Sequence, residues 1–244
     1  MFYLGTWEIG ALPFSEITKV LKFSLNLGIS AYDTAMIYGN GKVEKALGEM
    51  DTNDLCIVTK IPGCKKPEIN EQIPVKIIYP FNYVKEQITL SLKRLNRKKV
   101  SSLLLHNWCY SWEDKYLNQS IDLIDMLKEM NIADKIGISL PNNYQGQLHN
   151  LDLFKLIDIV ESPYNSNNHY IKDFLSFYTD TSKEIIIRSM LKGENIEPEK
   201  ISSVLKQRLL FCKNNNFSFT IGSTNTDHIK SNFELIQQLF NDEI

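Results

Sequence analysis

The chain has 244 residues, of which 43% are hydrophobic and 23% are charged, and this suits one large α/β domain spanning residues 1–244. The formal net charge of −2 gives no basic excess, so nucleic acid is not an expected partner. The four cysteines lack metal-type spacing and are too few for a disulfide scaffold, which favours a cytoplasmic protein, and no apolar run is long enough for a membrane span.

Short apolar or β-branched runs alternate with longer stretches of helical spacing along the chain, which is typical of repeated βα units. Eight strands are predicted, at residues 2–6, 29–33, 55–60, 101–106, 135–139, 156–161, 184–189 and 217–221. Several of these runs are apolar throughout, as expected for parallel strands that are covered on both faces. Eight such units in one domain predict a closed (β/α)8 TIM barrel, in which functional groups lie at the carboxyl ends of the strands.

Helices are predicted between the strands, because apolar side chains such as Ile17, Val20 and Leu21 recur on one helical face. The irregular stretch at residues 61–81 is interrupted by prolines, and we expect it to lie over a barrel end as a lid rather than in the core. A last helix is predicted at residues 226–240, which leaves only residues 241–244 beyond it. The short tail predicts an open barrel mouth.

Four ionisable side chains end or follow adjacent predicted strands. Asp33 ends the second strand and Tyr38 follows it, while Lys60 ends the third strand and His106 ends the fourth. Each has an ordinary structural interpretation, as a helix cap, a pocket wall, a solvated strand end or a hydrogen-bonded edge histidine. Packing does not require all four at one end of a barrel, so their combination predicts a catalytic site.

Together these side chains are suited to donating a proton to a carbonyl group. A free phenol titrates near pH 10, about 3 units above neutrality, which corresponds to roughly 4 kcal/mol. Lys60 is expected to lower the pKa of Tyr38 toward neutrality, and Asp33 to keep Lys60 charged and oriented. His106 would then hydrogen-bond the substrate oxygen as negative charge develops on it.

The segment at residues 32–39, Tyr-Asp-Thr-Ala-Met-Ile-Tyr-Gly, resembles the Asp-Thr-Ala-x-x-Tyr-Gly signature of the aldo-keto reductases. Leu-Gly-Thr-Trp at residues 4–7, Val-Thr-Lys at 58–60 and Leu-Leu-Leu-His at 103–106 resemble strands of the same family in the same order. The resemblance implies that Asp33, Tyr38, Lys60 and His106 are the catalytic set, with Tyr38 as the general acid. It also implies a carbonyl-reducing oxidoreductase that uses NADP(H), with NAD(H) as the alternative.

The resemblance further implies a set of cofactor-binding residues, although the chain has no Gly-x-Gly-x-x-Gly turn. Leu140 stands where the family has an asparagine and Glu161 where it has a glutamine, and a carboxylate cannot donate the hydrogen bond of an amide. Arg188 replaces a tyrosine that stacks on the nicotinamide ring; its guanidinium can also stack. The implied contacts are Thr6, Trp7, Ser139, Glu161, Arg188, Ser189, Gly222, Ser223, Thr224, His228 and Asn232.

An ordinary strand-turn-helix connection capped by Asn225 or Thr226 also explains the segment at residues 221–228, apart from its place in the chain. The segment has no lysine or arginine that could bind the 2′-phosphate of NADPH, since only hydroxyls, backbone amides and His228 are present. We therefore expect weak discrimination between NADPH and NADH.

Aromatic side chains recur at alternate positions after His106, as Trp108, Tyr110 and Trp112. They form either an extended segment packed on the barrel rim or a stacking platform for a ligand. The platform interpretation assigns substrate binding to Trp7, Trp108 and Tyr110. It favours a bulky polar carbonyl compound, such as a sugar or an activated sugar derivative.

Two other functions stay open at this level. The altered residues Leu140 and Glu161 are compatible with a non-catalytic nicotinamide-binding or regulatory barrel. Lys60 would also serve a lyase or isomerase as a Schiff-base amine. His149 and His169 have no partner pattern and are expected at the surface, and no metal site is predicted.

Overall fold

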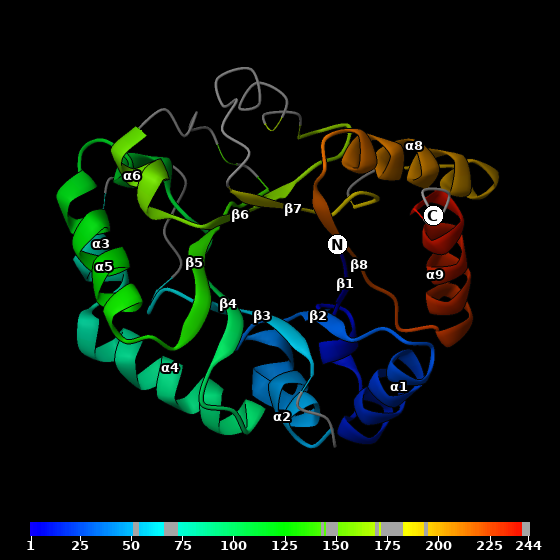
Figure 1. The fold of residues 1–244 in the computed structure, drawn as a ribbon, viewed down its shortest axis with the longest axis horizontal. Helices are drawn as coiled ribbons and strands as arrows, with labels where there is room; N and C mark the ends of the chain where they lie inside the picture. The colour runs from blue at the N-terminus through cyan, green and yellow to red at the C-terminus, as the bar shows by residue number, and fades with distance from the viewer. Residues whose placement is uncertain are drawn as a thin grey trace.

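The computed structural model describes residues 1–50, 54–65, 73–142, 144, 151–168, 171, 183–192 and 195–240. Its strands form a closed parallel barrel in chain order, from β1 to β8, which confirms the predicted (β/α)8 fold (Figure 1). The strands are β1 (Phe2–Gly5), β2 (Ala31–Asp33), β3 (Cys56–Ile61), β4 (Val100–His106), β5 (Ala133–Ser139), β6 (Ile159–Pro163), β7 (Glu184–Arg188) and β8 (Ser218–Ile221).

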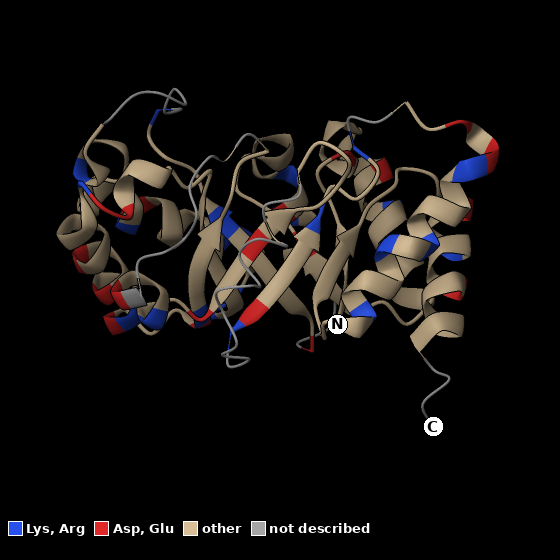
Figure 2. Ribbon diagram, turned by 90° about the horizontal axis from the view of Figure 1, so that it is seen from above, with Lys and Arg blue, Asp and Glu red and all other residues tan. Residues whose placement is uncertain are grey.

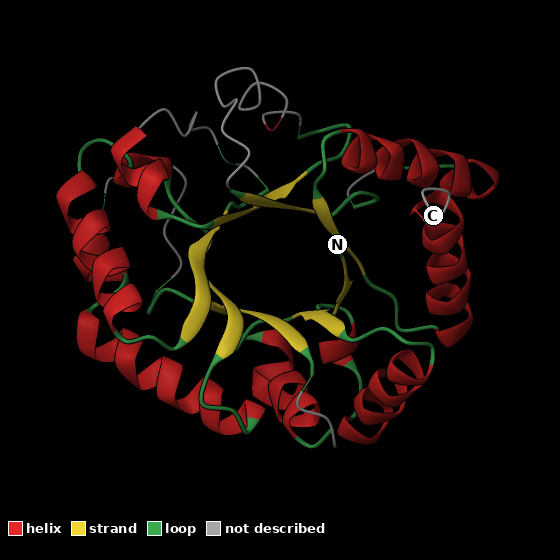
Figure 3. Cartoon of the chain, in the orientation of Figure 1, coloured by secondary structure: helices red, strands yellow, loops and turns green. Residues whose placement is uncertain are grey.

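Helices lie outside the ring of strands (Figure 3). The described α-helices are α1 (Phe14–Asn26), α2 (Lys42–Gly48), α3 (Val75–Ile78), α4 (Phe81–Leu95), α5 (Leu117–Glu129), α6 (Leu151–Leu156), α8 (Ile201–Asn214) and α9 (Thr226–Phe240). Short 3-10 helices are η1 (Ile9–Ala11), η2 (Tyr38–Gly41), η3 (Tyr110–Trp112) and η4 (Pro198–Lys200). None of the described helices combines the length and the apolar character that a membrane span requires.

The barrel interior contains an apolar layer that supports the polar site. Six buried residues from six strands contact one another there: Tyr3, Ala31, Val58, Leu104, Ile159 and Ile186. Successive side chains of a strand point to opposite faces, so the residue two positions later also faces the interior. In five of these strands that later residue is ionisable, namely Asp33, Lys60, His106, Glu161 and Arg188. Figure 2 shows that acidic and basic positions occur on the strands themselves.

Strand register places part of this polar layer side by side. His106 of β4 pairs with Ser139 of β5, and Ser139 pairs in turn with Glu161 of β6. On the other side, Asp33 of β2 pairs with Val58 of β3, two residues before Lys60. The carboxyl ends of neighbouring strands therefore bring the predicted catalytic side chains to one end of the barrel.

The structure corrects two predictions about these elements. The strand predicted at residues 156–161 begins only at Ile159, because residues up to Leu156 belong to α6. Leu153, Phe154 and Ile157 are all buried. The apolar residues on this stretch of the sequence therefore belong to two elements, first to a helix face and then to a strand. Asp158 separates the two elements, and its side chain accepts a hydrogen bond from the backbone N–H of Ile136 on β5.

The second correction concerns the stretch at residues 61–81, part of which is buried in the core. It contains α3, and Val75, Ile78 and Tyr79 are each at most 1% exposed. The hydroxyl of Tyr79 donates to the backbone oxygen of His106 at 2.6 Å, so this segment supports the end of β4. Residues 66–72 of the lid expected at residues 61–81, the histidines at 149 and 169, and the tail at 241–244 lie outside the described residues.

Candidate active site

The four predicted catalytic side chains meet at the carboxyl end of the barrel. Lys60 forms an ion pair with Asp33, and its Nζ lies 5.4 Å from the ring centroid of Tyr38. The ring centroids of Tyr38 and His106 are 6.2 Å apart in an edge-on arrangement. Side chains from β2, β3, β4 and the loop after β2 therefore surround one small volume.

The position of Tyr38 depends on the backbone that follows it. Gly39, Asn40 and Gly41 all have positive φ angles, of 59°, 54° and 81°. A Cβ atom on Gly39 would lie 2.5 Å from the backbone oxygen of Gly10 in η1, so the two backbones pack too closely for a side chain. This turn seats Tyr38 against Trp7, with ring centroids 5.1 Å apart.

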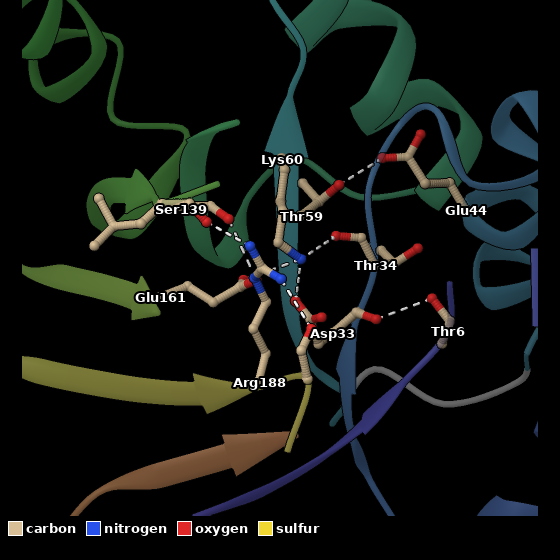
Figure 4. Close-up of polar contacts among 11 residues, drawn as sticks. Thr6, Asp33, Thr34, Glu44, Thr59, Lys60, Ser139, Glu161 and Arg188 are labelled. Atoms are coloured by element: carbon tan, nitrogen blue, oxygen red, sulfur yellow. Dashed lines mark hydrogen bonds and ion pairs between the residues drawn. The ribbon is translucent and has the colours of Figure 1, made fainter. Parts of the chain in front are cut away.

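Lys60 is fully buried, and its charge is matched by partners on three sides. Its Nζ donates to Asp33 Oδ1 and, at 3.0 Å, to the backbone oxygen of Thr34, and it lies 3.1 Å from Glu161 Oε2 (Figure 4). Burial alone would lower the pKa of Lys60, but the two carboxylates raise it above its usual value. Lys60 is therefore an ammonium group at every physiological pH, which disfavours a Schiff-base role.

Asp33 is anchored at the centre of this arrangement. Burial and the Glu161 carboxylate raise the pKa of Asp33 to about 7, although Lys60 opposes them. Thr6, which the resemblance assigns to cofactor binding, is fully buried, and its hydroxyl donates to the backbone oxygen of Asp33 at 2.9 Å. In the structure, Thr6 joins the end of β1 to the end of β2.

Glu161 and Arg188 form a second ion pair that the sequence did not predict. Arg188 Nε lies 3.0 Å from Glu161 Oε1, to which the Ser139 hydroxyl also donates at 3.3 Å (Figure 4). Arg188 further donates to the backbone oxygen of Leu140 and to Ser189 Oγ. The resemblance implies separate cofactor contacts for these two residues. The sequence indicated that they meet only through their spacing, because each charged residue lies two positions after an isoleucine that faces the barrel interior, Ile159 or Ile186.

The His106 side chain is neutral in this environment. Burial, followed by the positive charges of Lys60 and Arg188, lowers the pKa of His106 to about 3. Its Nδ1 atom is buried and has no hydrogen-bond partner among the described residues. A neutral imidazole can donate or accept one hydrogen bond at each nitrogen according to its tautomer.

The expectation that Lys60 brings the pKa of Tyr38 toward neutrality is wrong for this arrangement. Burial raises the pKa of Tyr38 to about 12, and the carboxylates of Asp33 and Glu161 offset the lowering by Lys60. Tyr38 therefore carries its proton across the physiological pH range.

The aromatic residues after β4 do not form the expected stacking platform. Trp108 is fully buried and packs edge-on against Trp112, with ring centroids 5.1 Å apart. Tyr110 is half-buried, whereas Trp7 is 55% exposed beside Tyr38. Of the three residues assigned to the substrate, Trp7 presents the open aromatic surface.

The remaining predicted cofactor residues lie after β8 and at the start of α9. Gly222, Thr224 and His228 are exposed, and Ser223 and Asn232 are partly exposed. Asn225 Oδ1 accepts from the backbone N–H groups of Asp227 and His228, at 2.8 and 3.3 Å, so Asn225 caps this helix. Among the described residues, no group of His, Cys, Asp and Glu side chains is arranged to hold a metal ion.

The fold and this site define a (β/α)8 barrel with a buried lysine, a phenol and a neutral imidazole at the carboxyl end of its strands. The model of the aldo/keto reductase family matches residues 2–199. The chain therefore belongs to the aldo/keto reductase family of oxidoreductase enzymes.

Solved structures support the fold. PA4992 from Pseudomonas aeruginosa, provisionally described as an aldo-keto reductase, is 18% identical, with a TM-score of 0.72 over 97% of this chain and 90% of that one. The aldo-keto reductase AKR11C1 from Bacillus halodurans is 18% identical, with a TM-score of 0.70 over 97% and 86%. A point mutant of Gox0644, solved in complex with NADPH, is 18% identical, with a TM-score of 0.68 over 96% and 82%. A search of curated proteins found no match.

Proposed function

We propose that this protein reduces an aldehyde or ketone to an alcohol with a nicotinamide cofactor, and that Tyr38 is the general acid. The observation that carries the proposal is the meeting of Tyr38, Lys60, Asp33 and His106 at the carboxyl end of the barrel. Their order and spacing match the family signature, and a structural relative was solved with NADPH. NADP(H) is therefore the proposed cofactor.

The polar groups beside Tyr38 are suited to hold the nicotinamide carboxamide. An amide needs one acceptor for its N–H groups and one donor for its oxygen, and Glu161 and Arg188 offer this pair in place of two amide side chains. Glu161 Oε2 lies in ion-pair contact with Lys60 but has no directed hydrogen bond among the described residues, so it retains acceptor capacity. Ser139 and Ser189 would assist in orienting the group.

When bound, the reduced nicotinamide supplies hydride to the carbonyl carbon. Tyr38 supplies the proton to the carbonyl oxygen, for which its fully protonated state is the required one. Lys60 stabilises the phenolate that remains, and Asp33 keeps Lys60 fixed. His106, neutral and adjacent to Tyr38, is placed to donate a hydrogen bond to the substrate oxygen as charge develops on it.

For the substrate we propose a polar carbonyl compound with an apolar face, of the sugar type. The support for this class is the exposed Trp7 ring next to Tyr38, because aromatic rings beside hydrogen-bonding groups are suited to such ligands. Lys192 Nζ lies 5.6 Å from the Trp7 ring centroid and adds a cation at this side of the mouth.

A second candidate function is a nicotinamide-binding barrel without turnover. The specific observation in its favour is that Arg188 is already engaged by Glu161, Leu140 and Asn142, where the resemblance implies contacts to the cofactor. The intact set around Tyr38 favours the enzyme over the binder.

The experiment that separates the two is a comparison of the wild-type protein with Tyr38→Phe. We expect Tyr38→Phe to lower kcat for carbonyl reduction by about a hundredfold or more, because the proton donor acts only in the transition state. The Kd for NADPH, measured by fluorescence quenching, should stay within about twofold. Retention of more than about a tenth of kcat would contradict Tyr38 as the acid, and NADPH binding without turnover of any carbonyl in a panel would favour the binder.

A further inference from the structure

Glu161 gives Lys60 a second carboxylate partner. Glu161 is fully buried and reaches Lys60 Nζ at 3.1 Å from β6, opposite to Asp33 on β2 (Figure 4). Buried charges interact strongly because little water screens them, so a second carboxylate at this distance changes the field of the ammonium group.

Glu161 is also held firmly in place. One of its oxygens contacts Arg188 Nε at 3.0 Å and accepts from Ser139 at 3.3 Å, while the other faces Lys60. Arg188 is in turn fixed by Asn142 Oδ1, to which its Nη1 donates at 2.8 Å. The carboxylate therefore lies between two cations and cannot swing away without losing both.

The charges around Tyr38 come from every strand that borders it and balance one another. They are the cations Lys60 and Arg188 and the carboxylates Asp33 and Glu161, with the neutral His106 on the remaining side. With Glu161 in place, two cations face two acidic side chains, and Glu161 and Asp33 oppose the stabilisation that Lys60 and Arg188 give the phenolate form of Tyr38. With an amide in its place, two cations would face a single carboxylate.

We propose that Glu161 is a positioning residue that shares the Lys60 ammonium with Asp33 and weakens the stabilisation that Lys60 gives the Tyr38 phenolate, so that Tyr38 stays protonated and can act as the acid of carbonyl reduction up to a higher pH. In reduction, the carbonyl carbon accepts hydride from the reduced nicotinamide, the carbonyl oxygen takes the Tyr38 proton, and water re-protonates the phenolate. Alcohol oxidation needs the reverse, a Tyr38 phenolate that accepts the alcohol proton. The effect on the pH dependence of the reaction rests on the proposed function, whereas the effect of Glu161 on the titration of Tyr38 does not.

The test is a titration of Tyr38 in the protein without substrate or cofactor. Phenolate absorbance near 295 nm is followed between about pH 7 and pH 11 for the wild type and for Glu161→Gln, each subtracted from its Tyr38→Phe counterpart. Burial raises the pKa of Tyr38 to about 12 in the wild type. We expect Glu161→Gln to lower the midpoint by at least about one pH unit, a tenfold change in proton affinity, which brings it to about pH 11 or below.

Two matched variants separate charge from structure. Glu161→Asp keeps the negative charge and should leave the Tyr38 titration near that of the wild type. Glu184→Gln removes a carboxylate at the opposite end of β7, where Glu184 pairs with Lys135, and should also leave it unchanged. Circular dichroism at each pH confirms that every variant stays folded.

The proposal would be overturned if Tyr38 were less than half ionised at about pH 11 in folded Glu161→Gln. It would also be overturned if Glu184→Gln shifted the Tyr38 midpoint by the same amount. If the wild type reduces no carbonyl but Glu161→Gln still lowers the Tyr38 midpoint, the proposed function fails and this proposal stands. In an active enzyme, Glu161→Gln should also move the rise of kcat/KM for alcohol oxidation to lower pH, because oxidation needs the Tyr38 phenolate, and an unchanged pH profile would count against the proposed effect on the reaction.

Discussion

At the scale of single residues, two tryptophans near the site have opposite surroundings. Trp7 is 55% exposed beside Tyr38, whereas Trp108 is fully buried against Trp112. An exposed ring that borders a polar site contributes to ligand contact, and a buried ring contributes to folding. The two residues therefore form a natural pair for testing the proposed substrate class.

We expect Trp7→Ala to raise KM for a sugar-type carbonyl about tenfold more than for a small aldehyde, because only the larger ligand reaches the ring. Trp108→Ala should instead lower the free energy of unfolding by roughly 3–5 kcal/mol, as large truncations in a core do. Steady-state kinetics and urea denaturation measure the two effects. Equal KM changes for both substrates in Trp7→Ala would contradict the sugar-type assignment.

The sequence predicted that Asp33, Tyr38, Lys60 and His106 lie at one end of the barrel, but not the charges that surround them. Asp33, Lys60 and His106 end or nearly end strands that are recognisable from their composition, so a barrel alone brings them together. The contacts of Glu161 with Lys60 and Arg188 depend on strand register and on side-chain reach across the barrel interior. Those distances follow only once the closed barrel is known. Burial is the main cause of the raised pKa of Tyr38, and the Asp33 and Glu161 carboxylates add to it.

At the scale of elements, a second buried carboxylate joins the outer helices to the lysine strand. Glu44 of α2 is fully buried and accepts from Thr59 of β3 at 2.7 Å (Figure 4). It also accepts from Ser91 of α4. Its other oxygen pairs with Arg94 of α4 at 2.7 Å. Because Thr59 precedes Lys60 and points to the opposite face of β3, this network supports the strand that carries Lys60.

Glu44→Ala should lower the free energy of unfolding by roughly 3–5 kcal/mol, because it leaves Thr59 and Ser91 without their acceptor and Arg94 without its carboxylate. The control is Glu49→Ala, since Glu49 is half-exposed and only 3.9 Å from Lys45 in a surface pair. That change should cost about 1 kcal/mol or less. Urea denaturation of the two variants gives the comparison, and similar losses in both would show that the Glu44 network adds no stability.

Element types were more predictable than element boundaries. The last helix, predicted at residues 226–240, is observed as Thr226–Phe240, because its polar cap and apolar face are both visible in the sequence. The start of β6 was missed because the apolar residues before it belong to α6. Helix α3 was missed because it is short and lies among prolines, although its residues pack against the core.

At the scale of the whole molecule, the barrel separates stability from chemistry. An apolar layer fills the middle of the strand ring, and the ionisable side chains lie two residues further along the same strands. Helices cover the outside of the ring (Figure 1). The site is thus a rigid, buried charge network with Trp7 at its open side, which suits positioned proton transfer to a bound carbonyl.

The most direct test of this account is the transfer of deuterium to a carbonyl substrate. The purified protein is incubated with a sugar-type aldehyde and NADPH that carries deuterium at its hydride-donating carbon, and the alcohol is analysed by mass spectrometry. We expect an alcohol with one deuterium on the former carbonyl carbon, formed by the wild type and reduced about a hundredfold or more in Tyr38→Phe. An absence of alcohol across a panel of aldehydes and ketones, or an alcohol without deuterium, would contradict the proposed carbonyl reduction.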